Sequence, residues 1–451
     1  MEQLLKAGNG MIKHAIWVLI AGLAIGYSSI YFAGASSGAY DAGAINSGDT
    51  AWMLASAALV MLMTPAVGFF YGGMVSAKNV VSVLKQSIVI LALVSIQWVV
   101  LGYSLVFGTD VNGLIGGLQF FGLKGVGFAP NADYAGTIPA LVFMIFQAMF
   151  AIITPALIIG AFVERIRFSA LIAFVLLWTT LIYDPVAHWV WGVGGWLRDL
   201  GALDFAGGTV VHMTAGFSAL AAALIIGRRL NHSPVGSSAN NIPFVILGAV
   251  LLWFGWFGFN AGSALAAGAL AASAFVVTNI AAAAAALTWA FLSWAENKKP
   301  SAMAAATGAV CGLVAITPAS GFVGPIAAIA IGVIAGVITY AAVFIRTHKI
   351  KIDDTLDVWA AHGVGGLTGA ILTGIFAEKV INAAGNDGLL FGNPGQLLVQ
   401  VVAVAAVALY AFFGTWVILK FVSFFSPLRV SSSQESEGLD LAVHGEAGYR
   451  L

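Results

Sequence analysis

Long apolar runs, separated by short stretches of charged and turn-forming residues, make up most of the chain. A helix needs about 20 apolar residues to cross roughly 30 Å of hydrocarbon. No run shows the apolar–polar alternation of a lipid-facing barrel strand, so each is expected to be a helix, which satisfies its own backbone hydrogen bonds. The pattern predicts an all-α integral membrane protein with eleven transmembrane helices, at roughly 50–75, 87–107, 138–163, 168–190, 208–226, 243–260, 264–294, 302–318, 322–345, 358–377 and 397–425.

The composition agrees with lipid as the solvent for most of the surface. Hydrophobic residues make up 60% of the chain and charged residues 8%, whereas a soluble domain carries about 25% charged residues. The formal net charge of +0 gives no global attraction to nucleic acid. The single cysteine, Cys311, excludes an internal disulfide and a multi-cysteine metal site.

The loops between the runs differ in their Lys and Arg content. If the first run enters the membrane from outside, the inner loops and the tail hold fourteen of these cations and the outer loops hold three. Positively charged loops stay in the cytoplasm. We therefore expect residues 49–425 to form a bundle in the inner (plasma) membrane that begins outside, and residues 426–451 to form a cytoplasmic tail.

Residues 1–48 precede this bundle and resemble a signal peptide. Lys6 and Lys13 come before an apolar stretch at 15–26, and the small residues at 33–35 offer a cleavage site. The alternative is a retained extra helix, which would leave the rest of the topology unchanged.

An internal repeat is visible in the spacing of charged and ionisable residues. Asp204 precedes His212 by eight residues in the fifth run, and Asp354 precedes His362 by the same interval in the tenth. A repeat of five spans is inverted, because an odd number of crossings reverses direction. We expect a 5+5 inverted repeat plus a C-terminal helix, with the transport pathway at the interface between the repeats, near the midplane.

The two histidines are the strongest candidates for a functional site. An ionisable side chain inside a span is costly and indicates function by default, although a histidine can also serve as a hydrogen-bonding contact between helices. Matching positions in a repeat favour function. A bis-histidine haem site is a further alternative, but the small residues in the flanks GGTVVHMTAG and HGVGGLTG favour close approach of the helices.

Asp204 lies at the expected outer mouth of the fifth run, just ahead of Gly207 and Gly208. Its carboxylate could stabilise a cation over a distance. It could also cap the helix by accepting backbone N–H bonds. The two roles are compatible.

Six ordered blocks of the chain resemble the ammonium transporter family, which contains bacterial and plant ammonium transporters and the more distant Rhesus proteins. They include FQAMFAIITPALIIGAFVERIRFSA, DFAGGTVVHMTAGFSAL and WFGFNAGSAL. They favour the bacterial ammonium-transporter branch over the Rhesus branch, and they cover nearly all of the chain after residue 48. The blocks occupy residues 49–79, 146–170, 204–220, 256–265, 353–377 and 438–449.

The resemblance implies a homotrimer with one pore in each subunit. By motif position, an outer ammonium-recruitment site would consist of Phe150, Trp191 and Ser263, and a phenylalanine gate below it would consist of Phe150 and Phe259. The twin histidines of the family correspond to His212 and His362. We expect no enzymatic activity, no cofactor and no metal.

These residue types suit the chemistry of ammonium. Each aromatic face attracts a cation by ~0.5–2 kcal/mol, and a hydroxyl adds a directed acceptor. A bare cation in an apolar pore would cost tens of kcal/mol, but ammonium can lose a proton and pass as ammonia, whereas potassium cannot. Neutral imidazoles can hydrogen-bond ammonia, and a coupled pair could relay the proton. Electrogenic transport, neutral gas conduction and a sensor role remain alternatives.

The tail contains two different segments. SSSQESE at 431–437 is expected to be a flexible acidic spacer, and GLDLAVHGEAGY at 438–449 matches the cytoplasmic motif of the family. We expect the motif to fold back against inner loops that include 164–167 and to couple neighbouring subunits, although a disordered tail is the alternative. The resemblance also implies docking of a PII-type nitrogen regulatory protein.

Overall fold

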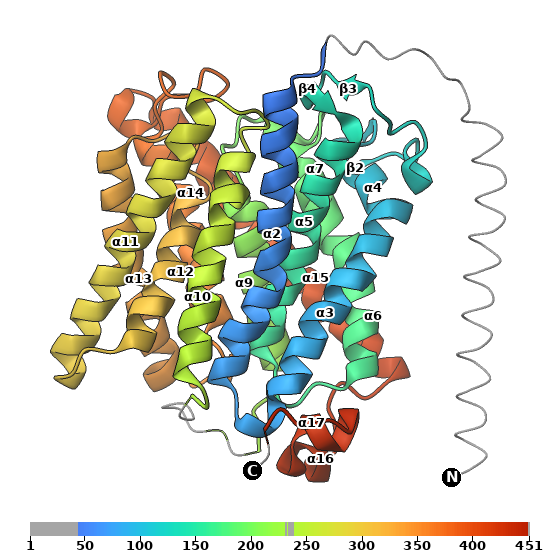
Figure 1. Ribbon diagram of the computed structural model, residues 1–451, viewed down its shortest axis with the longest axis vertical. Coiled ribbons are helices and arrows are strands. Elements are labelled where there is room, and N and C mark those ends of the chain that lie inside the picture. The colour runs from blue at the N-terminus through green and yellow to red at the C-terminus, as the bar shows by residue number, and fades with distance from the viewer. Residues whose placement is uncertain (1–43, 231, 233–238, 450–451) are drawn as a thin grey trace.

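The computed structural model describes residues 44–230, 232 and 239–449. Its helices form a bundle, with short strands at one end and the last two helices at the other (Figure 1). Among the described residues, nine helices are long and apolar enough to cross a membrane. The all-α membrane fold expected from the sequence is therefore confirmed. The expected signal peptide, at 1–35, lies outside the described residues.

The first half of the bundle follows the first five predicted runs. Several spans combine an α-helix with π- or 3₁₀-helical turns. Their bounds are α2 Ser47–Met74; η2 Ala77–Asn79, α3 Val80–Gln97, η3 Trp98–Gly102 and α4 Tyr103–Phe107; α5 Ala140–Ile158 and η5 Ile159–Ala161; α6 Phe168–Trp178, η6 Thr179–Tyr183, α7 Asp184–Trp191 and the short α8 Trp196–Asp199; and η7 Gly208–Met213 with α9 Thr214–Ile226.

The second half follows the remaining runs. Two of its helices, α12 with 15 residues and α14 with 12, are shorter than the nine long spans but lie at the eighth and tenth predicted runs. The bounds are α10 Ile242–Trp256 and η8 Phe257–Ala261; α11 Ala269–Asn297; α12 Ala302–Ile316; α13 Pro325–Ile345 and η9 Arg346–Ile350; η10 Trp359–Val364 and α14 Gly365–Phe376; and α15 Pro394–Phe425.

Short strands and turns join the spans near the N-terminal end of α2 (Figure 1). Two small antiparallel pairs form there. They are β1 Asp110–Val111 with β2 Ile115–Gly116, and β3 Pro130–Asn131 with β4 Ala135–Pro139. Single 3₁₀ turns complete the loops, namely η4 Phe121–Leu123 and η11 Leu389–Phe391.

Several helices begin where a polar side chain caps the first turn. The side chains of Asn46, Asn241 and Ser301 each accept a hydrogen bond from the backbone N–H three residues later. These caps satisfy donors that have no partner within the helix. α10, α13 and α15 also carry proline in the first turn, where its missing N–H costs nothing.

The tail folds back onto the opposite end of the bundle as two short helices, α16 Ser432–Glu437 and α17 Leu439–His444 (Figure 1). The backbone N–H of Arg167 donates to the carbonyl of Leu428 at 2.8 Å. The carboxylate of Asp440 accepts the N–H groups of Val81 and Ser82, at 3.0 and 2.7 Å. The pairing with loop residues 165–167 is thus made by residues 428–430, which precede the motif, whereas the motif itself contacts the start of α3.

The expectation of a flexible spacer at 431–437 is wrong. Ser431 and Gln434 form a capping box that starts α16, and such a box satisfies two otherwise unpaired N–H groups at once. Glu435 then anchors the helix, because its carboxylate accepts hydrogen bonds from the N–H of Leu230 and from Arg429, both at 2.7 Å.

Candidate functional site

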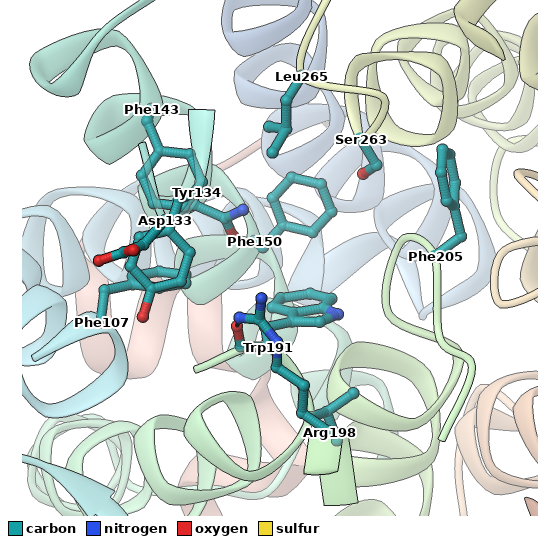
Figure 2. A pocket seen from close by; sticks show the side chains of 12 residues that line it. Phe107, Asp133, Tyr134, Phe143, Phe150, Trp191, Arg198, Phe205, Ser263 and Leu265 are labelled. Atoms are coloured by element: carbon teal, nitrogen blue, oxygen red, sulfur yellow. Dashed lines mark hydrogen bonds between the residues drawn. The ribbon is translucent and has the colours of Figure 1, made fainter. Parts of the chain in front are cut away.

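A cavity of about 220 Å³ opens at the end of the bundle that carries the strands (Figure 2). We call it the outer cavity, after the side of the membrane expected for this end from the loop charges. The structure brings the three expected recruitment residues, Phe150, Trp191 and Ser263, together in its wall. They come from α5, the end of α7 and the turn after η8. The other lining residues are Phe107, Asp133, Tyr134, Phe143, Gln147, Val190, Arg198, Phe205 and Leu265.

Hydrogen bonds and ring contacts fix the orientation of these three side chains. The indole N–H of Trp191 donates to the carbonyl of Asp204 at 2.9 Å, and its ring meets Phe150 edge to face at 5.8 Å. The hydroxyl of Ser263 donates to the carbonyl of Phe259 at 2.9 Å. Because the hydroxyl proton is used in this hydrogen bond, the lone pairs of the Ser263 oxygen remain available as acceptors.

Two phenylalanine rings lie between this cavity and a second, smaller space, because Phe150 lines the first and Phe259 lines the second. The centroids of Phe150 and Phe259 lie 4.3 Å apart, and both side chains are essentially fully buried. Phe146 supports Phe150 from the side, at 5.0 Å.

Below the rings lies a narrow, apolar space of about 10 Å³, about the smallest volume that can hold one water molecule. His212 and His362 both line it, with their Nδ1 atoms 3.3 Å apart. The remaining wall is almost entirely apolar, formed by Met63, Val67, Phe70, Tyr71, Ile153, Leu157, Val211, Leu252, Trp256, Phe259 and Val310.

The two imidazoles belong to a stack of flat rings. His212 lies 5.3 Å from His362, 5.2 Å from Trp256 and 5.8 Å from Phe259, with interplanar angles of 23–28°. The Nε2 atom of His212 is buried and has no hydrogen-bond partner among the described residues. This atom is a free polar group in an otherwise apolar space.

Each histidine sits in a π-helical turn, η7 or η10. Such turns are rare in proteins, and those that occur are often found at functional sites. An aspartate precedes each turn. The carboxylate of Asp204 accepts the N–H groups of Gly207, Gly208, Thr209 and Val210 at 2.6–3.1 Å, and that of Asp354 accepts the N–H of Trp359 at 2.7 Å.

Asp204 is therefore a helix cap in this structure. Its carboxylate also accepts the hydroxyl of Thr209 and does not line the outer cavity. The aspartate holds the first turn of η7 and supports Trp191 through its backbone carbonyl.

Glycines let the two histidine-bearing helices touch. A β-carbon at Gly366 would lie 2.7 Å from the carbonyl oxygen of Gly208, and one at Gly216 would overlap the backbone of Gly363. This close crossing leaves no room for a macrocycle between the imidazoles. The geometry thus disfavours the haem alternative.

A wide vestibule of about 710 Å³ opens on the tail side and reaches His362. Buried charges pair in neighbouring loops at the same end of the bundle. Arg229 binds Glu164 at 2.6 Å and Asp353 at 3.0 Å. Burial alone would raise the pKa of Asp353, but the charge of Arg165 and the hydrogen bonds from Arg229 outweigh it and lower the pKa to about 2.

Some lining residues were not singled out from the sequence. Tyr134 reaches the outer cavity from the turn between β3 and β4, and no local signal indicates this placement. Arg198 lines the same cavity, although the sequence marked it only as one of three outer cations. Trp256 stacks on His212, and its position inside the block WFGFNAGSAL was the available signal.

The chain has clear relatives. The model of the Ammonium Transporter Family matches residues 51–449. An ammonium transporter of Bacillus subtilis is 51% identical, over 89% of this chain and 98% of that protein. The crystal structure of Saccharomyces cerevisiae Mep2 superposes with a TM-score of 0.81 at 36% identity, over 86% of this chain and 89% of that one.

A structure described as a sensor Amt protein is also similar, with a TM-score of 0.81 and 32% identity over 88% of this chain and 98% of that one. These relatives bear out the family expected from the ordered blocks, and the matching family is one of transporters rather than enzymes. This chain belongs to the Ammonium Transporter Family.

Proposed function

We propose that this protein transports ammonium across a membrane by recruiting the cation, removing a proton and passing ammonia through the twin-histidine pore. The observation that carries the proposal is the order of the spaces along the bundle. A cavity with aromatic walls comes first, two phenylalanine rings close it, and a narrow space with two imidazoles follows.

The outer cavity suits a small monovalent cation. The rings of Phe150 and Trp191 meet at 88°, so a cation between them can contact two aromatic surfaces. Each contact of this kind is worth ~0.5–2 kcal/mol. The oxygen of Ser263 supplies the acceptor that an N–H group needs, and an alkali cation gains no directed hydrogen bond there.

The space below the rings suits ammonia. Two neutral imidazoles that share one Nδ1–H···Nδ1 hydrogen bond must be in opposite tautomers, because only one proton fits between the two nitrogens. One Nε2 atom is then an acceptor and the other a donor. Ammonia has both an N–H and a lone pair, so it can pair with either ring as it passes.

The same shared proton gives the histidines a second role as a relay in this proposal. A proton released above the gate could enter one ring and leave the other toward the inner vestibule, which His362 also lines. Strongly interacting groups titrate as a pair. In this proposal both the proton and ammonia reach the inner side.

Ammonium-evoked current in liposomes, measured together with internal pH, tests the proposal. Relay of the proton predicts inward current. Passage of ammonia alone predicts internal alkalinisation without current. Liposomes that behave like protein-free ones under an ammonium gradient would contradict transport itself.

We further propose that the protein forms a homotrimer in the inner membrane, with its strand end outside and its tail in the cytoplasm. In this proposal the tail couples neighbouring subunits, and its contacts with loop residues 165–167, Val81 and Ser82 hold it against the bundle, where such coupling can act. A PII-type regulator would dock at this face. Deleting residues 438–451 without any effect on transport would contradict the coupling.

A further inference from the structure

A permanent positive charge lies in the wall of the outer cavity. The guanidinium of Arg198 donates a hydrogen bond to the carbonyl oxygen of Trp191 at 2.7 Å. It also lies 5.8 Å from the centroid of the Tyr134 ring. Figure 2 shows its side chain reaching up to Trp191. A cation thus already occupies an acceptor and an aromatic face at the place where ammonium is recruited.

The charge of Arg198 is not neutralised locally. In the described part of the chain, no carboxylate oxygen lies within 4.0 Å of its guanidinium. Asp133 lines the same cavity and carries the opposite charge, but the hydrogen bonds of Trp191 are made with Asp204 and Arg198. The positive potential of Arg198 is therefore strongest beside Trp191, and the negative charge of Asp133 opposes it from another part of the wall.

We propose that Arg198 is a specificity-determining residue, which lowers the affinity of the outer cavity for ammonium and disfavours cations of higher charge. This inference rests on the proposed function. Coulomb repulsion is proportional to the charge of the incoming ion. A divalent ion such as Mg²⁺ therefore meets twice the electrostatic free energy that ammonium meets, and the corresponding affinity ratio is squared. A purely steric effect of the Arg198 side chain would not depend on the charge of the ion in this way.

The test compares Arg198→Gln with the parent protein in liposomes. The ammonium concentration that gives half-maximal transport should fall by about 2- to 30-fold, for a separation of roughly 8 Å and an effective dielectric between that of water and that of a protein surface. The Mg²⁺ concentration that inhibits half of the transport should fall by the square of that factor. Arg198→Lys keeps the charge and should stay close to the parent.

Two controls separate the cavity from the general surface charge. Lys379→Gln removes one exposed positive charge from an outer loop without touching the cavity, and it should leave both concentrations unchanged. Asp133→Asn should act in the opposite direction and weaken ammonium recruitment. Both residues are exposed, so the variants are expected to fold.

Several results would overturn the inference. The first is a half-saturating ammonium concentration in Arg198→Gln equal to that of the parent, and the second is a change of the same size in Lys379→Gln. The third is that Arg198→Gln lowers the half-saturating ammonium concentration and the half-inhibiting Mg²⁺ concentration by the same factor. The fourth is that Mg²⁺ does not inhibit Arg198→Gln at all. A parent protein without ammonium transport would instead contradict the proposed function, so the two failures can be told apart.

Discussion

Gly216 and Gly363 meet where the two histidine-bearing helices cross, so closely that a β-carbon at Gly216 would overlap the backbone nitrogen of Gly363. Gly216 follows His212 by four residues, and Gly363 directly follows His362. The distance between the imidazoles is therefore set by backbone contact, and not only by the side chains. Only a residue without a β-carbon permits this approach.

Replacing Gly216 by Ala should push α9 and η10 apart. Overpacking of this kind costs about 1–3 kcal/mol, so the thermal midpoint of the purified protein should fall. Ammonium selectivity over potassium should fall with it, because the imidazoles separate. Gly136→Ala is the control, since nothing lies within 4 Å of a β-carbon added there. Equal thermal midpoints and equal ammonium selectivity in the two variants would contradict this prediction.

Replacing Trp191 by Leu should weaken recruitment while sparing the pore below the gate. Loss of one cation–π contact of ~0.5–2 kcal/mol raises the half-saturating ammonium concentration by about 2- to 30-fold. Transport measured at alkaline pH, where more cargo is neutral, should change less. Trp294→Leu is a matched control, because that side chain is 51% exposed and lies outside the three cavities. Equal losses of transport at neutral and at alkaline pH would indicate a packing defect.

Acid should selectively remove the contribution of Asp353 to stability. Its pKa of about 2 in the folded protein lies below the value of roughly 3.9 for an unfolded chain. The stabilisation is therefore complete above about pH 4 and is lost as the pH falls toward about 2. At neutral pH, Asp353→Asn should cost about 3–5 kcal/mol, because it leaves Arg229 and Arg165 short of a buried partner.

Unfolding midpoints of the parent and of Asp353→Asn, followed from pH 7 to pH 3, check this prediction. The difference between the two proteins should shrink as the pH falls. Asp199→Asn, at an exposed position, provides the control. A difference that stays constant over the whole range would show that the carboxylate charge is not the source of the effect.

Features that depend on periodicity and spacing could be predicted from the sequence. Apolar runs alone indicated the spans, and the equal intervals from Asp204 to His212 and from Asp354 to His362 indicated a repeat with two matching sites. The glycines near the histidines pointed to close helix crossing. Each of these signals is local, because a helix imposes its own geometry on nearby residues.

Features that depend on contacts between distant loops could not be predicted in this way. Tyr134 lines the outer cavity only because the turn between β3 and β4 packs against α5, where the Tyr134 ring stacks on Phe143. The acidic segment 431–437 looked flexible by composition, yet Arg429 and the N–H of Leu230 hold Glu435 in place. Such pairings arise from tertiary structure, and composition carries no trace of them.

The central claim is that His212 and His362 select ammonium by letting it through only as ammonia. The most direct measurement is the current of His362→Ala protein in liposomes under separate ammonium and potassium gradients, with internal pH recorded. Size-exclusion chromatography checks that the variant assembles like the parent. We predict a new potassium current and a changed pH response, because the space left by the imidazole can fill with water. A variant that stays ammonium-selective, with current and pH response like the parent, would contradict the claim.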